Sequence, residues 1–300
     1  MNKNLVRLAF LFAALALTGR HAVAQEMWEP LLYGPINTWT GELYPEHTLA
    51  MQSYSWYNKV RGTYDGDGNY AALPSGEQRY NFTQGFYAYY MATKRLELAT
   101  MVTFLHNSVK TAAGDSGTHN GMQDTQLFMR YVLSMEKGWA PTVTLQAQAK
   151  LPTGKFQNAN PEKQGADIVG TGSWDAGCGL NFTKRLKPVI VHGDVFFTVP
   201  SNATVDGAKT EYATYWNYDL AVEYPFSHGL SALVEFNGFY QGNKTVGGVE
   251  QSNKYKYLNV LMGLTYLKGR MQVYGGYMRT LSGVNAFAYD SGLLSLAYTF

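Results

Sequence analysis

The chain has 300 residues, with 24 basic and 22 acidic side chains and a single cysteine, Cys178. One cysteine cannot form an internal disulfide bond, so the fold cannot depend on one. Charged residues make up only 15% of the chain and aromatic residues another 15%, whereas globular proteins average about 25% charged residues. This composition argues against a water-soluble domain and is typical of a membrane β-barrel with aromatic girdles.

Residues 1–24 have the three parts of a secretory signal peptide. A basic start with Lys3 and Arg7 precedes an apolar run over residues 8–17, and Ala22-Val-Ala24 forms an A-x-A cleavage site. Its removal leaves 21 basic against 22 acidic residues, so the charge gives no reason to expect a nucleic-acid partner. The rest of the chain lacks an apolar run of the roughly 18 residues that a membrane helix needs. We therefore expect export to the outer membrane of a Gram-negative bacterium.

Residues 25–47 form a separate N-terminal leader. Pro30, Pro35 and Pro45 interrupt it, and no stretch is long enough for a barrel strand. We predict a periplasmic segment that is either free or folded into the mouth of a barrel.

From residue 48 to the C-terminus, apolar and polar residues alternate in segments of about 10–14 residues, a length that suits a tilted strand crossing a hydrocarbon layer. This pattern predicts an all-β fold, a transmembrane antiparallel up-and-down β-barrel over residues 48–300. The twelve predicted strands are 48–60, 79–92, 95–107, 122–136, 140–151, 171–184, 188–200, 212–225, 229–241, 255–267, 270–281 and 290–300.

The predicted connections alternate between long and short. The long ones, which carry the glycine- and asparagine-rich loop sequences, are 61–78, 108–121, 152–170, 201–211, 242–254 and 282–289. The short ones are 93–94, 137–139, 185–187, 226–228 and 268–269. Long loops at one end and tight turns at the other are typical of outer-membrane barrels, with both termini in the periplasm.

Each predicted strand has one apolar and one polar face. In the segment from residue 79, for example, Tyr80, Phe82 and Phe86 share a face, opposite Asn81 and Thr83. An apolar face so rich in large side chains would promote aggregation in water, so it must contact lipid and the polar face must line the lumen. Twelve strands lie between the eight that side chains fill and the sixteen that leave an open channel, which predicts a narrow, partly obstructed lumen.

Charged and titratable residues on the polar face are the candidate lumen-lining set. They are Arg95, Glu97, Asp124, Arg130, Lys150, Asp175, His192, Asp194, Asp219, Glu223 and Glu235. Rings of charge set selectivity in pores, but such residues can equally just hydrate a lumen and pair across strands. Both interpretations stay open. Acidic residues outnumber basic ones in this set, which predicts weak cation selectivity or the passage of neutral solutes.

The region from Lys150 to Asp175 carries the clearest motif. A strand ends in Pro152-Thr-Gly154, a variable glycine-rich loop follows, and Gly170-Thr-Gly172 leads into the next strand. This arrangement resembles the outer-membrane family labelled the putative MetA-pathway of phenol degradation. The resemblance implies a channel or transport barrel associated with the uptake of aromatic or other small compounds. The same prolines and glycines are also explained as strand ends and turns.

Other site motifs are absent or incomplete. Neither Gly154-Lys155 nor Gly170-Thr-Gly172 has the spacing of a phosphate-binding loop or a dinucleotide fingerprint. The histidines are dispersed and lack paired metal ligands. We therefore expect no cofactor and no metal.

One catalytic pattern is present. His106-Asn-Ser108 with Asn120 twelve residues later resembles the His-x-Ser and later Asn of the outer-membrane phospholipase, itself a twelve-stranded barrel. A base beside a hydroxyl can activate a nucleophile. Against this, Val109-Lys110 replaces the phospholipase's Asn-Gly, and Asn120 has the parity of the lumen face.

The last ten residues end on a free aromatic side chain. Leu294, Leu296, Tyr298 and Phe300 alternate with smaller or more polar residues. The stretch resembles the closing strand of Gram-negative outer-membrane proteins, which implies that Tyr298 and Phe300 are read by the barrel-assembly machinery. We predict that this strand pairs with the first one near residues 51–57.

The sequence thus favours a non-enzymatic outer-membrane channel or facilitator for small molecules. Its partners would be outer-membrane lipids, the barrel-assembly machinery and a small-molecule solute, which the resemblance suggests is an aromatic or other hydrophobic compound. Two alternatives remain: a barrel-embedded lipid hydrolase that uses His106 and Ser108, and a structural or surface-binding barrel that acts through its long loops.

Overall fold

A computed structural model describes residues 34–227 and 229–300. The predicted signal peptide and residues 25–33 of the leader lie outside the described residues. In the described part of the chain, no helix is both long enough and apolar enough to cross a membrane.

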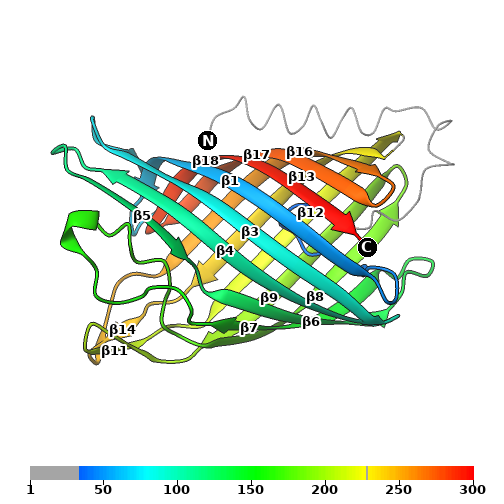
Figure 1. Ribbon diagram of the computed structural model, residues 1–300, viewed down its shortest axis with the longest axis horizontal. Helices are drawn as coiled ribbons and strands as arrows, with labels where there is room; N and C mark the ends of the chain where they lie inside the picture. The colour runs from blue at the N-terminus through cyan, green and yellow to red at the C-terminus, as the bar shows by residue number, and fades with distance from the viewer. Residues whose placement is uncertain (1–33, 228) are drawn as a thin grey trace.

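Twelve long antiparallel strands form a closed barrel within the described residues (Figure 1). Neighbours in sequence are neighbours in the sheet, and the last strand pairs with the first to close it. The strands are β1 (Leu49–Tyr64), β3 (Gln78–Thr93), β4 (Leu96–Lys110), β6 (Thr125–Ser134), β7 (Thr142–Leu151), β8 (Asp175–Leu186), β9 (Val189–Pro200), β12 (Tyr215–Ser227), β13 (Leu230–Gln241), β16 (Tyr255–Lys268), β17 (Met271–Val284) and β18 (Ala286–Thr299). Each predicted strand overlaps one of these, so the predicted fold class is confirmed.

The closure has the predicted register. Met51 of β1 lies opposite Tyr298 of β18, and Trp56 lies opposite Leu293. The N–H of Phe300 extends this seam, because it donates to the carbonyl oxygen of Leu49 at 2.8 Å.

The two faces of the barrel wall differ as the alternation predicts. On β18, Leu294 and Leu296 are 62% and 48% exposed, whereas Leu293 and Ala297, on either side of this pair, are 7% and 0% exposed. The exposed side chains point away from the barrel axis, since the strand contacts its neighbours on both edges. The outer surface is therefore a continuous apolar band suited to lipid.

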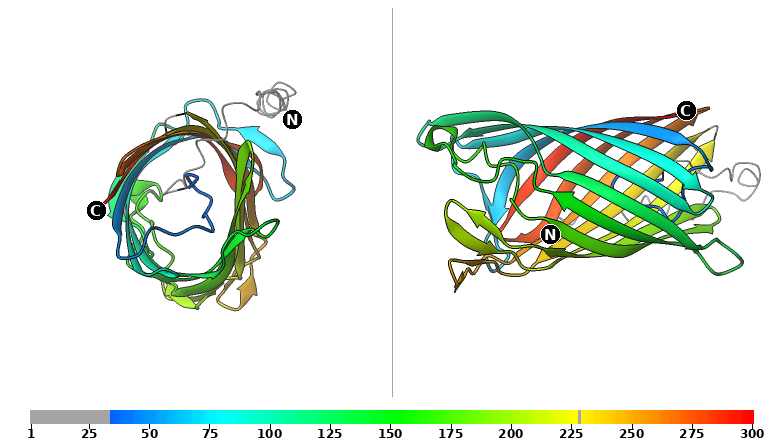
Figure 2. Two further views of the ribbon diagram at one scale, coloured as in Figure 1. Left: turned by 90° about the vertical axis from the view of Figure 1, so that its right-hand side faces the viewer. Right: turned by 60° about the horizontal axis from the view of Figure 1, so that its bottom comes forward.

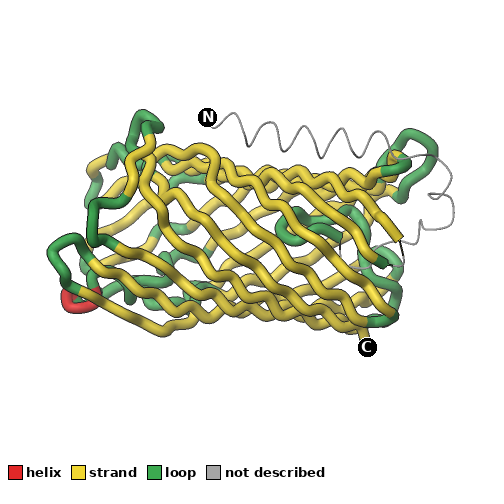
Figure 3. The backbone as a smooth tube through the Cα atoms, turned by 90° about the horizontal axis from the view of Figure 1, so that it is seen from above, coloured by secondary structure: helices red, strands yellow, loops and turns green. Residues whose placement is uncertain are grey.

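The long connections gather at one end of the barrel (Figure 3). Those between β1 and β3 and between β4 and β6 hold β2 (Tyr70–Ala72) and β5 (Ser116–Met122), and the connection between β7 and β8 contains a short 3₁₀ helix, η1 (Pro161–Lys163). A small separate sheet forms over two further connections, from β10 (Ala203–Val205), β11 (Ala208–Glu211), β14 (Thr245–Val246) and β15 (Val249–Glu250).

One predicted loop is wrong. The segment 282–289 belongs mostly to strands, because β17 runs to Val284 and β18 begins at Ala286. Asn285 alone joins them, with a φ of 49°, and asparagine tolerates this left-handed conformation better than most residues. Its N–H donates to the carbonyl oxygen of Asp65, and its side chain donates to that of Lys254, both at 2.9 Å. These contacts hold the tight turn against neighbouring loops.

The described part of the leader lies inside the barrel. Figure 2 shows it as a dark blue segment within the ring of strands. Thr38, Thr40 and Tyr44 are each less than 9% exposed. Of the two positions left open by the sequence, residues 34–47 take the one inside the barrel.

Candidate functional site

The leader is held in the lumen by the carboxylate of Glu235, on β13. One oxygen accepts the N–H of Ile36 at 2.6 Å, and the other accepts the N–H groups of Asn37 and Thr38 at 3.0 and 2.9 Å. The Thr38 hydroxyl donates to the second oxygen as well, at 2.9 Å. Glu235 is fully buried. Its carboxylate has lost its hydrating water, and these four donors replace the lost hydrogen bonds. The leader and this wall of the barrel therefore form one polar unit.

Trp39 links the next part of the leader to both sides of the lumen. Its backbone N–H donates to Asp194 Oδ2 at 2.6 Å, which ties the leader to β9. Its ring packs at 5.0 Å from that of Phe128 and at 6.0 Å from that of Tyr87. The guanidinium of Arg130 lies 5.0 Å from the Trp39 ring, a cation–π arrangement. Trp39 thus bridges the lumen.

Arg130 is itself part of a buried ion pair. Its Nη1 donates to Glu97 Oε1 at 2.6 Å, and both side chains are at most 3% exposed. The guanidinium also donates to the backbone carbonyl oxygens of Thr40 and Glu42. This predicted lumen charge therefore binds the chain's own leader.

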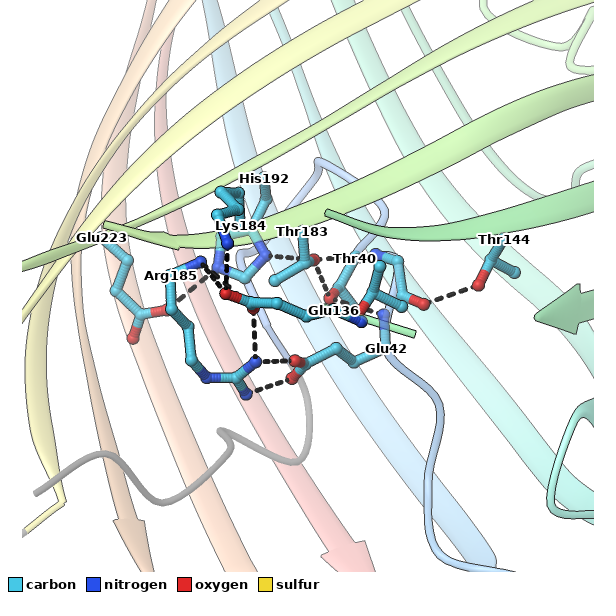
Figure 4. A network of polar contacts seen from close by, with 11 residues as sticks. Thr40, Glu42, Glu136, Thr144, Thr183, Lys184, Arg185, His192 and Glu223 are labelled. Atoms are coloured by element: carbon cyan, nitrogen blue, oxygen red, sulfur yellow. Dashed lines mark hydrogen bonds and ion pairs between the residues drawn. The ribbon is translucent and has the colours of Figure 1, made fainter. Parts of the chain in front are cut away.

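A chain of polar contacts that begins at Thr183 holds Gly41 of the leader (Figure 4). The Thr183 hydroxyl accepts the N–H of Gly41 at 2.9 Å and lies 3.0 Å from His192 Nδ1. His192 Nε2 in turn lies 3.3 Å from the Glu223 carboxylate.

Glu42 binds the short-turn end of the barrel wall. Arg185 forms a bidentate ion pair with it and a weaker contact with Glu136 at 3.3 Å. Burial raises the pKa of Glu136, but hydrogen bonds from Lys184 and Arg185 outweigh it and leave that pKa below its ordinary value. Glu136 therefore stays ionised and keeps this cluster paired.

A cavity of about 680 Å³ lies in the lumen and is bounded on one side by Ile36, Asn37 and Trp39 of the leader. Its walls combine amide, hydroxyl and acidic side chains with many aromatic ones. The aromatic residues that line it are Trp39, Tyr54, Trp56, Tyr87, Phe128, Phe196, Tyr212, Tyr215, Phe239 and Tyr257. Its size and mixed lining suit a small ligand with an apolar body and a few polar groups.

Two neighbouring rows of side chains organise one wall of this cavity. The acidic row consists of direct cross-strand partners on β9, β12, β13 and β16: Asp194, Asp219, Asn237 and Asn259. Two residues closer to the long loops, the aromatic row contains Phe196, Asn217, Phe239 and Tyr257 in the same strand order. Because side chains two apart share a face, both rows point into the lumen.

A family model matches this chain over residues 61–296, and its description is "Putative MetA-pathway of phenol degradation". The match spans most of the barrel. The chain belongs to this family. The resemblance seen in the sequence is thereby confirmed. A comparison with curated proteins found no match.

Solved structures share the fold of this family member. The COG4313 outer membrane channel from Pseudomonas putida F1 superposes with a TM-score of 0.75 at 17% identity, covering 89% of this chain and 100% of that one. The translocator domain of the autotransporter NalP from Neisseria meningitidis has a TM-score of 0.50 at 11% identity, covering 84% and 88%. The fold is therefore that of an outer-membrane barrel.

The loop motif that carries the family resemblance closes around a carboxylate. Asp124 Oδ1 accepts the N–H of Gly154 at 2.9 Å, and Oδ2 accepts the N–H of Thr171 at 3.1 Å. A Cβ atom on Gly170 would lie 2.7 Å from the Gly154 carbonyl oxygen and 2.8 Å from Asp124 Oδ1, so this close approach requires glycine. The motif thus fastens the 152–174 connection to the barrel, as the turn interpretation predicts.

Charges around this connection are paired. Lys150 Nζ lies 2.9 Å from Asp175 and 3.4 Å from Asp124. Farther out, the Lys155 ammonium and the Asn160 N–H lower the pKa of Asp167 to about 2. Asp167 therefore remains ionised at any physiological pH, and its ion pair with Lys155 persists.

The structure divides the predicted lumen residues into groups. Lys150, Asp175, Asp194 and Asp219 line the cavity. Asp124 lies in the loop closure just before β6. The residues buried around the leader are Glu97, Arg130, His192, Glu223 and Glu235. The prediction for Arg95 is wrong: it is exposed in the turn between β3 and β4, because β4 begins at Leu96.

The residues of the catalytic pattern are only partly assembled. β5 pairs with β4 so that Asn120 lies opposite His106, and their side chains hydrogen-bond at 2.7 Å. Asn120 therefore shares a face with His106, and its parity with the lumen face does not separate the two, because β5 has its own register. Ser108, however, makes no hydrogen bond with His106 among the described contacts, so nothing couples the hydroxyl to the base.

Within residues 34–227 and 229–300, no group of three or more His, Cys, Asp or Glu side chains could hold a metal ion. The sequence reasoning missed Trp39, Phe239 and Tyr257. The last two share the parity of Asn237 and Asn259, so their place in the lumen could have been read from the alternation. Trp39 lies in the leader, where apolar and polar residues do not alternate, so the sequence gives no sign that its side chain enters the lumen.

Proposed function

We propose that this protein is an outer-membrane channel or facilitator for small molecules, exported by a signal peptide and narrowed by its own leader. The cavity carries the proposal: it lies inside a closed, lipid-facing barrel and has a mixed polar and aromatic lining. The shared fold with a protein named as an outer membrane channel supports it. Outer-membrane lipids, the barrel-assembly machinery and the solute are its proposed partners.

The lining supports aromatic or other hydrophobic solutes. A planar ring can pack against the aromatic side chains, while the amide and hydroxyl groups hydrogen-bond its substituents. The leader forms the floor of the cavity on the side of the short turns. A solute that enters past the long loops would meet the leader before it reaches the periplasm, so the leader acts as a plug or gate.

Conductance across a planar bilayer tests the proposal. Lys150, the one Lys or Arg that lines the described cavity, is paired with Asp175, which leaves Asp194 and Asp219 without a cation in the lining. We therefore expect small currents and a reversal potential, under a salt gradient, that shows cation preference. No conductance in any orientation, or a clear anion preference, would contradict the proposal.

We also propose that the channel acts without catalysis, because Ser108 is not coupled to His106. Phospholipid hydrolysis by the purified protein in detergent should stay at background, and Ser108→Ala should not change it. A measurable rate that this substitution removes would favour the hydrolase alternative instead.

A further inference from the structure

We propose that the acidic row and the aromatic row together form a binding site for a protonated amine attached to an aromatic ring. The inference rests on the proposed channel function, because it assigns the solute class to the cavity of that channel. It concerns one wall, where β9, β12, β13 and β16 meet.

The first observation is a pair of neighbouring acids that take part in none of the described ion pairs. Asp194 and Asp219 are direct cross-strand partners, which places their Cβ atoms about 4.5–5.5 Å apart. The Lys150 ammonium is engaged by Asp175 and Asp124. Like charges at this spacing are unfavourable without a cation between them or beside them.

The second observation is a pair of buried acceptor atoms without donors. Asp194 is 3% exposed; its Oδ2 accepts the Trp39 N–H, but its Oδ1 has no hydrogen-bond partner. Asn259, at 9% exposed, likewise has no partner for Oδ1. Both side chains line the cavity. Buried acceptors in native proteins are almost always satisfied, by protein or by water, so these two oxygen atoms are available to the donors of a ligand in the cavity.

The third observation gives the rest of the ligand. The Phe239 and Tyr257 rings stack with an interplanar angle of 9° and centroids 5.4 Å apart, and the Tyr215 ring lies 5.4 Å from that of Phe239. These rings are one step toward the long loops from the acids, about 7 Å along the strands. An ammonium on a short side chain spans much of that separation from its ring. The ring then packs on the aromatic row while the ammonium, which aromatic faces also attract, reaches Asp219 and Asp194.

The charge of the ligand follows from these contacts. An anion would be repelled by both carboxylates. A neutral alcohol could donate one hydrogen bond but would bring no positive charge to the two acids. An ammonium supplies three donors and a positive charge, so of these three groups it alone meets both needs.

Binding of three matched probes to the purified full-length protein in detergent tests the inference. They are 2-phenylethylamine, 2-phenylethanol and ethylamine, which separate the charge from the ring. Tryptophan fluorescence can report binding, since Trp39 and Trp56 line the cavity. We expect 2-phenylethylamine to bind about tenfold or more tightly than either of the other probes.

Asp219→Asn should remove most of this preference. The matched control is Asp67→Asn, which changes an exposed loop acid that does not line the cavity. Asp194→Asn is a second variant should Asp219→Asn fold poorly, with the heat-dependent mobility of the barrel on gels as the measure of folding. The site is overturned if the amine and the alcohol bind alike, if ethylamine binds as well as the ring-bearing amine, or if the acid variants retain the preference.

The failure of this inference is distinct from that of the proposed function. Binding in detergent needs no transport, and conductance needs no amine. If the protein conducts ions but shows no preference for the amine, only the binding site is refuted. If the protein never conducts ions, the proposed channel function is refuted, whichever probe binds.

Discussion

Glu235 is the residue on which the position of the leader most depends. It is a fully buried carboxylate that is paired with no Lys or Arg among the described ion pairs. Its charge is instead satisfied by three backbone N–H groups and one hydroxyl from residues 36–38. Hydrogen bonds to a charged acceptor contribute about 1.5–3 kcal/mol each. The carboxylate therefore stabilises the leader in the lumen, and the leader in turn makes the buried charge tolerable.

Replacing Glu235 by Gln should loosen the leader. The amide keeps one acceptor oxygen but puts an NH₂ group against N–H donors, so we expect the docked state to lose at least about 2 kcal/mol. That corresponds to roughly a thirtyfold shift in the ratio of docked to released leader. Labelling of an Asn37→Cys protein, in a Cys178→Ser background, with a polar maleimide measures the release. Bilayer conductance should rise in parallel.

The matched control for this substitution is Glu162→Gln, an exposed acid in η1 that faces solvent. It should change neither labelling nor conductance. If Glu235→Gln labels no faster than this control, the carboxylate does not hold the leader.

At the level of strands, alternation alone predicts most of the fold. Lipid on one side and a polar lumen on the other impose opposite demands on successive side chains, so the period of two is unusually clear. It places Leu294 and Leu296 outside and Asp194 and Glu235 inside, as the structure shows. All twelve strands follow from it.

What alternation cannot predict is the partner of an inward side chain. The donors to Glu235 are backbone N–H groups, which nearly every residue carries, so no sequence signal marks residues 36–38 as its ligands. The leader itself has no periodicity, and its docking depends on tertiary contacts such as those of Trp39. The prediction of strand ends is wrong where tertiary contacts decide them. Asn285 makes a one-residue turn where a longer loop is expected.

The contacts of the loop motif at Pro152–Gly154 and Gly170–Gly172 could not be predicted from the sequence either. Pro152 and the glycines predict turns correctly, but the close approach of Gly154 and Gly170 over Asp124 depends on two loops meeting in space. The candidate solute site could be predicted only as a set of inward acids. Its aromatic row needs the cross-strand register of β12, β13 and β16, which fixes which rings stack.

At the scale of the whole molecule, closure of the barrel depends on the last strand. β18 pairs with β1 from Ala50 opposite Thr299 to Tyr64 opposite Ala286. Since a closed barrel leaves no unpaired edge in the membrane, this seam is required for insertion. Phe300 adds one hydrogen bond, to Leu49, and an edge-to-face contact with Tyr298 at 4.9 Å, while its ring stays 59% exposed.

Removing Phe300 should therefore affect assembly more than the finished barrel. The seam would lose one terminal hydrogen bond, worth about 1 kcal/mol, out of a long ladder. In the proposed function, however, the assembly machinery recognises this exposed terminal ring before the barrel closes. We expect the folded fraction in outer membranes to fall severalfold, while protein that does fold, or is refolded in detergent, conducts as the intact chain does. Phe104→Ala, which removes a ring of similar exposure from the lipid face of β4, is the matched control. Equal folded fractions for the two variants would show that Phe300 acts only as another lipid-facing side chain, and altered conductance in the refolded protein would place it in the pore instead.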